Sequence, residues 1–239
     1  MLGADVDTPP AGPSTSVEDG VAFSRRLFDW SVQQSEAASV ALYSLGSPGL
    51  LAEATGEIVA LLAGWELLDS EAVVLDLGCG TGRMEEALAP VVAQIHGLDV
   101  SPQMVAVAQR RCGHLGNVTV ALSSGLNLGS VATASCDLML AVDSFPYVVQ
   151  AGLELAEVMF AEAARVLRPG GEFVIFNFSY RGDRARDRAD ARLFAASNGL
   201  ELLVDGDQPF KLWNGDAYRM RKLSSLSPGG RGGAVHSLP

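Results

Sequence analysis

The sequence predicts an α/β fold: a doubly wound, mostly parallel sheet of about seven strands, covered by helices from the N-terminal part of the chain. Short apolar runs alternate with longer segments of helical spacing, which is the pattern of βαβ units. The first of these runs, Val73–Leu75, reaches an acid and then three glycines at alternate positions. The last two runs, Leu200–Val204 and Ala217–Lys222, flank a loop without a helix and so predict an antiparallel pair.

The segment before the first strand is predicted to be helical. Residues 1–15 are rich in Pro, Gly, Asp and Ser and are expected to be disordered. Ser16 has an acid three positions later, as at many helix starts, and apolar residues recur from there to Val40. After a break, Leu50–Leu62 predicts a further helix. We expect residues 16–66 to cover the site, and leave open whether they form a lid or part of the core.

The glycine-rich segment favours a ligand site. Val73–Leu75 is free of polar residues, as in a strand buried on both faces, and it leads to Asp76. The acid is followed by three glycines, Gly78, Gly80 and Gly82. Because glycine lacks a Cβ and reaches positive φ, a ligand can lie against this backbone. Met84–Pro90 predicts a helix start, which would offer free amide donors beside the ligand.

A second strand, Gln94–Val100, ends in another acid, Asp99, 23 residues after Asp76. This is close to the spacing at which an acid binds ribose hydroxyls in nucleoside-binding α/β folds. One carboxylate can accept from both hydroxyls at once. Ser101 and Pro102 then begin a helix as N-cap and first helical residue.

The pattern Asp-x-Gly-x-Gly-x-Gly from Asp76 resembles the cofactor loop of class I S-adenosylmethionine-dependent methyltransferases of the small-molecule type. It differs from the Gly-x-Gly-x-x-Gly of dinucleotide-binding proteins. Residues 164–175 also resemble the turn before the fifth strand of that family. The resemblance implies a Rossmann-like methyltransferase fold, S-adenosyl-L-methionine as cofactor, and methyl transfer. It places Asp76 near the ammonium of the cofactor and Met104 against its adenine.

Later strands bring further candidates. Asn117–Leu122 predicts a third strand, and the resemblance implies an adenine-binding acid soon after it, where this chain has Ser124. Asp137–Val142 predicts a fourth strand, and the following loop carries Asp143 and Tyr147 as candidate catalytic residues near the methyl. Asp143 is read either as an acid that orients the acceptor or removes its proton, or as a helix cap. The candidate cofactor-binding residues are Tyr43, Asp76, Gly78, Cys79, Gly80, Gly82, Asp99, Val100, Met104, Ser124, Gly125 and Leu126.

The C-terminal half completes the predicted domain, residues 67–223, which is followed by a flexible tail at 224–239. Leu153–Leu167 predicts a helix and Glu172–Phe178 a fifth strand, separated by a Pro-Gly-Gly turn. Asp187–Asn198 predicts another helix. The stretch Arg181–Arg192 mixes five arginines with three aspartates, which favours a solvated helix face. Aromatic residues of the N-terminal helices and of the loop between the last two strands are expected either to line the site or to pack these helices onto the domain. They are Phe23, Phe28, Trp30, Phe210 and Trp213.

Composition limits the class of protein. Hydrophobic residues make up 48% and charged residues 19%, as in globular proteins, and no apolar run reaches the length of a membrane span. The N-terminus has no secretion-signal pattern. A net charge of −11 disfavours nucleic acid and anionic membranes as partners. Three cysteines lack metal-ligand spacing, so we expect no metal and a reduced, cytoplasmic setting.

The sequence favours a methyltransferase over two alternatives and leaves a third open. A nicotinamide-dependent oxidoreductase is disfavoured by the glycine spacing and by the final antiparallel pair. A non-enzymatic binding protein is disfavoured because Asp76, Asp99 and the loop glycines are all present. A cofactor-assisted cyclase or decarboxylase on the same fold remains open. So do the acceptor, the methylated atom, the use of a general base, and the oligomeric state, with a homo-oligomer as one possibility.

Overall fold

The computed structural model describes residues 16–36, 39 and 47–224 of the chain. One seven-stranded sheet has the order β3-β2-β1-β4-β5-β7-β6. Strands β1 to β5 pair in parallel, and β7 runs antiparallel to both β5 and β6. The strands are β1 (Val73–Leu77), β2 (Gln94–Asp99), β3 (Val118–Leu122), β4 (Cys136–Val142), β5 (Leu167–Phe176), β6 (Leu200–Asp207) and β7 (Ala217–Lys222). The predicted doubly wound fold is confirmed.

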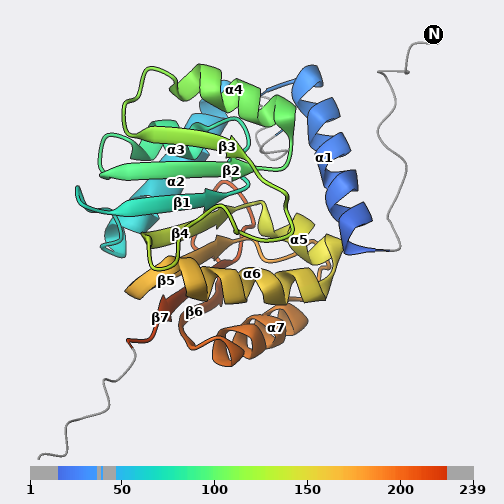
Figure 1. Ribbon diagram of the computed structural model, residues 1–239, viewed down its shortest axis with the longest axis vertical. Helices are drawn as coiled ribbons and strands as arrows, with labels where there is room; N and C mark the ends of the chain where they lie inside the picture. Colours follow the sequence, from blue (N-terminus) through green and yellow to red (C-terminus); the bar gives the residue numbers. More distant parts are fainter. Residues whose placement is uncertain (1–15, 37–38, 40–46, 225–239) are drawn as a thin grey trace, which may run out of the picture.

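Helices cover both faces of this sheet (Figure 1). They are α1 (Val17–Gln34), α2 (Pro48–Gly64), α3 (Arg83–Leu88), α4 (Pro102–Cys112), α5 (Phe145–Ala151), α6 (Leu153–Val166) and α7 (Arg184–Ser197). Successive strand side chains point to opposite faces, so Leu75 joins one core and Val74 the other. Phe160 of α6 lies in the first core, and Ile58 of α2 lies in the second.

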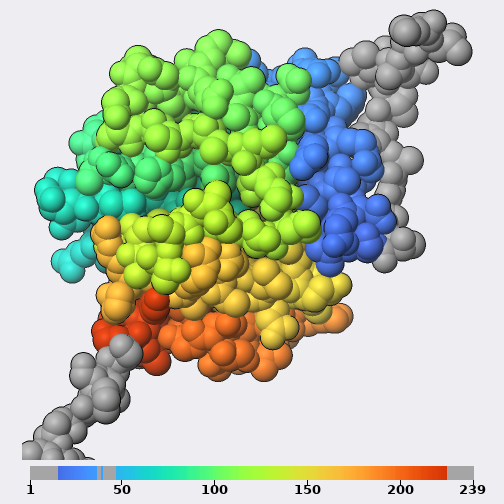
Figure 2. Space-filling model, viewed as in Figure 1, coloured from blue at the N-terminus to red at the C-terminus, as the bar shows by residue number. Residues whose placement is uncertain are grey.

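The two N-terminal helices pack in different places. α2 lies on the sheet face with α3, where Ile58 and Leu62 are fully buried. α1 stands beside the carboxyl ends of the strands and packs on α4 and α5 (Figures 1 and 2). Its Val21 belongs to the first core, and a Cβ on Gly20 would lie 2.6 Å from Cα of Ala151. α1 therefore contributes to the core and also covers one edge of the sheet.

Two features differ from the sequence-based expectations. The segment after β4, expected as a loop, forms the helix α5, which begins with Phe145 and Pro146. The Pro-Gly-Gly turn lies within β5, because the pairing register of β4 and β5 shifts between Cys136 and Leu138. The extra residues of β5 bulge opposite this shift, so the strand is longer than expected.

Candidate functional site

A cavity opens at the carboxyl ends of β1, β2 and β4, and we call it the first cavity. The chain leaves β1 toward β2 on one side and returns to β4 on the other, and ligands of open α/β sheets bind at such a switch point. α1 forms one wall through Val21, Ser24 and Phe28. The predicted residues that line this cavity are Asp76, Gly78, Cys79, Gly80, Asp99, Val100, Met104, Gly125, Asp143 and Tyr147.

The glycine loop turns sharply at the floor of the first cavity. Gly78 and Gly80 have φ of 78° and 55°, a region that residues with a Cβ rarely adopt. The N–H groups of Gly78 and Cys79 both donate to the carbonyl oxygen of Leu98, at 2.7 and 3.0 Å. A Cβ on Gly78 would lie 2.4 Å from Cβ of Ser144. Both backbone conformation and space therefore require glycine at position 78.

Cys79 is a structural residue of this loop. Its side chain is buried, and burial together with the nearby carboxyl groups raises the pKa of the thiol well above its usual value. Because the thiolate is the nucleophilic form, this cysteine is unreactive at neutral pH.

Asp99 joins the glycine loop to α4. Its Oδ2 accepts from the N–H of Gly80 and its Oδ1 from the N–H of Ser101, each at 2.9 Å. Ser101 Oγ in turn accepts from the N–H of Met104 and donates to Asp29 of α1 at 2.6 Å. A carboxylate has about four acceptor positions, so these two bonds leave room for a ligand with two hydroxyl donors.

Two buried carboxyl groups meet under the loop. Asp76 is 1% exposed and Glu85 is fully buried. Asp76 Oδ1 and both oxygens of Glu85 find no hydrogen-bond partner among the described residues. Burial, opposed by the charge of Arg83, raises the pKa of Asp76 to about 7. Burial also raises the pKa of Glu85 well above its usual value, and the neighbouring Asp76 adds to this rise. Burial therefore favours the protonated form of both carboxyl groups when no ligand is bound.

The unfolding free energy of the ligand-free protein is expected to fall as pH rises from about 4 to about 7, since both carboxyls must ionise in a buried place. A carboxyl group whose pKa is higher in the folded protein than in the unfolded chain stabilises the fold. For Asp76 this stabilisation is complete below the unfolded pKa near 4, and it is lost as the pH rises through the folded pKa of about 7. Glu85→Gln should reduce the fall by about 1–3 kcal/mol. The exposed neighbour on the same helix supplies the control, Glu86→Gln. Urea denaturation measures each slope, and equal slopes in wild type and Glu85→Gln would contradict this account.

Asp143 lies where the first cavity meets a second one, and it lines both. It ends β4 with a φ of 57°, an uncommon conformation for a non-glycine residue. Its Oδ1 accepts from Asn177 Nδ2 at 2.7 Å and from the hydroxyl of Tyr180 at 2.9 Å. Burial raises the pKa of Asp143, while these two donors oppose the rise. Asp143 therefore binds neighbouring side chains and does not cap α5.

Aromatic rings line the junction of the two cavities. The rings of Phe28 and Tyr147 meet edge to face at 4.7 Å between centroids, and those of Tyr147 and Tyr180 at 5.7 Å. Phe28 and Tyr147 line both cavities, and Tyr180 and Trp213 line the second. Of the five aromatic residues expected at the site, Phe28 and Trp213 line a cavity, whereas Phe23, Trp30 and Phe210 line neither. Phe210 instead packs against the second core, as the alternative expectation had it.

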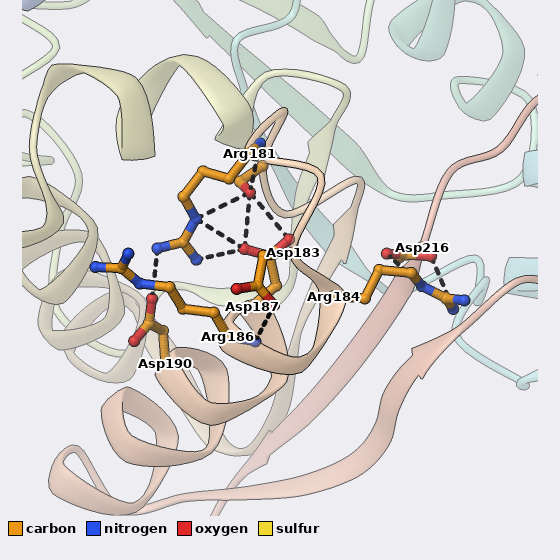
Figure 3. Close-up of polar contacts among 8 residues, drawn as sticks. Arg181, Asp183, Arg184, Arg186, Asp187, Asp190 and Asp216 are labelled. Atoms are coloured by element: carbon orange, nitrogen blue, oxygen red, sulfur yellow. Dashed lines mark hydrogen bonds and ion pairs between the residues drawn. The ribbon is translucent and has the colours of Figure 1, made fainter.

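The second cavity has a polar far wall formed by the loop after β5 and by α7. Ser179 donates to Asp187, which also accepts from Arg181, and Arg181 pairs with Asp190 at 2.8 Å (Figure 3). Asp187 is 3% exposed. The expectation of a solvated helix face is therefore wrong for this residue, because the loop folds Arg181 back onto α7. The network fixes the loop that carries Tyr180 to Asp143.

Three candidate cofactor residues, Gly82, Ser124 and Leu126, do not line the first cavity, and a fourth cannot be placed. Tyr43 is outside the described residues. Ser124 is exposed and accepts from the N–H of Leu126, and neither residue lines the first cavity. Gly82 starts α3 with a φ of 80° and packs against α4. The preceding serine, Ser123, is the one that lines the cavity, which corrects the prediction at 124 by one position.

Arg83 and Glu85 are site residues that sequence reasoning missed. Arg83 lines the first cavity and donates to Thr55 Oγ1 at 3.0 Å, and its charge acts on Asp76 and Asp143. The position of Arg83 directly after Gly82, the last loop glycine, is the sequence signal that could have identified it as a site residue. Glu85 had none, since Glu86 beside it is exposed and the helix is short.

The described residues contain neither a metal-binding cluster nor a membrane-spanning helix. No group of three or more His, Cys, Asp or Glu side chains could hold a metal ion in residues 16–36, 39 and 47–224. Over the same ranges, each helix is too short or too polar to span a membrane.

Comparisons with known proteins agree with this geometry. Residues 75–175 match the family model described as a methyltransferase domain. The chain is 32% identical over 111 residues to demethylmenaquinone methyltransferase of Tropheryma whipplei (strain Twist), a match that covers 45% of this chain. The chain spans 42% of the length of that relative.

Solved structures share the fold at lower sequence identity. Magnesium protoporphyrin IX methyltransferase from Synechocystis PCC 6803, solved with bound SAM, has a TM-score of 0.66 and 18% identity, covering 88% of this chain and all of that one. A cyclase, SpnF, has a TM-score of 0.55 and 19% identity, covering 79% of this chain and 96% of that one.

Proposed function

We propose that the chain is a class I S-adenosylmethionine-dependent methyltransferase, because residues 75–175 match a methyltransferase domain, and that it transfers a methyl group to a small-molecule acceptor. One observation carries the proposal. The acids at the carboxyl ends of β1, β2 and β4 all line one cavity above the glycine loop: Asp76 near the end of β1, Asp99 at the end of β2 and Asp143 directly after β4.

The residues of the first cavity fit the cofactor. Asp99 keeps acceptor positions for two ribose hydroxyls, and Met104 and Ser123 form the side for the adenine. The unpartnered carboxyl oxygen of Asp76 suits the ammonium group, which would also favour ionisation of the Asp76–Glu85 pair. Among the described residues, Arg83 is the cationic side chain that lines this cavity, and its guanidinium suits the carboxylate of the cofactor's methionine part.

When bound, the cofactor supplies a methyl group activated by a positive sulfur. The chain must hold the acceptor in line with it and exclude water. Asp143 and Tyr147, at the junction of the cavities, are the candidates for orienting the acceptor, and α1 shields the first cavity from solvent. The second cavity then holds the body of the acceptor.

A small acceptor and a cytoplasmic setting are part of the proposal. The net charge of −11 opposes nucleic acid as substrate. The thiols Cys79, Cys112 and Cys136 are all free and buried, as is common in reducing compartments.

Titration calorimetry with S-adenosylmethionine, S-adenosylhomocysteine and NAD tests the cofactor assignment. The first two are expected to bind saturably at one site, and NAD is not. Saturable binding of NAD alone would contradict the proposal. Since a cyclase shares this fold, detection of a methylated product after incubation with acceptors is the second measurement that the proposal requires.

A further inference from the structure

We propose that the acceptor is an amine, bound at the junction of the two cavities by Asp143 and the rings of Phe28, Tyr147 and Tyr180. This inference rests on the proposed function and specifies the substrate class of the same site. Three independent features of the junction support it: the balance of charges, the aromatic rings, and the kinds of side chain available as a base.

Among the described residues, no cationic side chain that lines the second cavity pairs with the Asp143 carboxylate. The other two carboxylates that line the second cavity each have a guanidinium partner. Asp187 pairs with Arg181, and Asp216 pairs with Arg184 at 3.1 Å. Asp143 instead accepts from two neutral groups, an amide and a phenol.

The cation whose charge reaches Asp143 is Arg83, which lines the first cavity and not the second. An acceptor that brings a positive charge or strong N–H donors would therefore complete the site from the second cavity.

The aromatic rings favour the same chemistry. Phe28, Tyr147 and Tyr180 follow one another edge to face around the junction. Ring faces attract ammonium groups, and the attraction strengthens where water is excluded. Tyr180 also donates to Asp143, so the carboxylate and the rings would contact the same group of the acceptor.

The available base is weak. Among the described residues that line either cavity there is no histidine and no lysine. An ammonium gives up a proton far more readily than an alcohol does, so a carboxylate is a sufficient base for an amine acceptor. The bound ammonium first gives one proton to the Asp143 carboxylate, which passes it to water. The lone pair freed in this way forms the N–C bond while the C–S pair leaves with sulfur, and the methylated ammonium that results is again paired with the Asp143 carboxylate.

Calorimetry in the presence of S-adenosylhomocysteine tests this inference by binding alone. Phenethylamine is expected to bind at least about tenfold more tightly than 2-phenylethanol, which has the same ring and chain length. Asp143→Asn should abolish this preference and leave the affinity for S-adenosylhomocysteine within about twofold. The control Asp207→Asn removes one exposed charge outside both cavities and should change neither value.

The outcomes separate the two proposals. Absence of phenethylamine binding, equal binding of the alcohol, or an unchanged preference in Asp143→Asn would overturn the amine assignment. Methylation of phenols or alcohols with no amine methylated would also overturn it, and would leave the methyltransferase function standing. Failure of the wild-type protein to bind S-adenosylhomocysteine would instead overturn the proposed function.

Discussion

Asp99→Ala is expected to weaken the binding of S-adenosylhomocysteine by about 2–4 kcal/mol, roughly 30- to 900-fold. The variant loses the proposed charge-assisted bonds to two ribose hydroxyls. The structure adds a second effect, because Asp99 also accepts from the N–H groups of Gly80 and Ser101. The ligand-free protein should therefore lose about 1–3 kcal/mol of unfolding free energy as well.

Asp99→Asn separates the two effects. The amide keeps the size of the side chain and one acceptor oxygen, so it should recover part of the stability and little of the affinity. Calorimetry gives the affinity and urea denaturation gives the stability. A dissociation constant within about twofold of wild type in Asp99→Ala would show that this carboxylate does not bind the ribose.

Gly78→Ala is expected to destabilise the protein by roughly 2–5 kcal/mol and to abolish measurable cofactor binding. The new Cβ would lie 2.4 Å from Cβ of Ser144, and the residue would keep a φ of 78°. The clash would push apart the loop after β1 and the start of α5, which both line the first cavity.

Gly170→Ala is the matched control for this glycine. Gly170 has a φ of 81°, and a Cβ there would meet nothing within 4 Å. The control should therefore show the backbone strain alone, about 1–2 kcal/mol, with normal cofactor binding. Equal destabilisation in both variants by urea denaturation would mean that the contact with Ser144 is relieved at little cost.

The sheet and the glycine loop were predictable because their patterns are local. Each strand is a short apolar run between turn residues, and the loop needs glycine where φ is positive. The cavity then brings the acids at the strand ends together, since parallel strands share one carboxyl edge.

The remaining site depended on contacts that no local pattern shows. Ser123 lines the cavity and its neighbour Ser124 is exposed, both in the loop after β3, so an error of one position in the alignment reverses the assignment. α5 is only two turns long, too short for a clear helical period. Asp187 is buried because the loop just before α7 folds back and places Arg181, six residues earlier in the chain, on it.

The role of α1 also required the structure. Its residues give a helical pattern that fits either a lid or a core helix. In the fold it is both: Val21 packs in the first core and also lines the first cavity. Asp29 and Arg25 further tie α1 to the start of α4 through Ser101 Oγ and the carbonyl oxygen of Val100.

The central claim is that the first cavity holds S-adenosylmethionine with its sulfur directed to Asp143. A crystal structure of the complex with S-adenosylhomocysteine tests it most directly. We expect the ribose hydroxyls on Asp99, the ammonium on Asp76, and the sulfur at the junction of the two cavities. Density for the ligand outside the first cavity, or a ribose turned away from Asp99, would contradict the account.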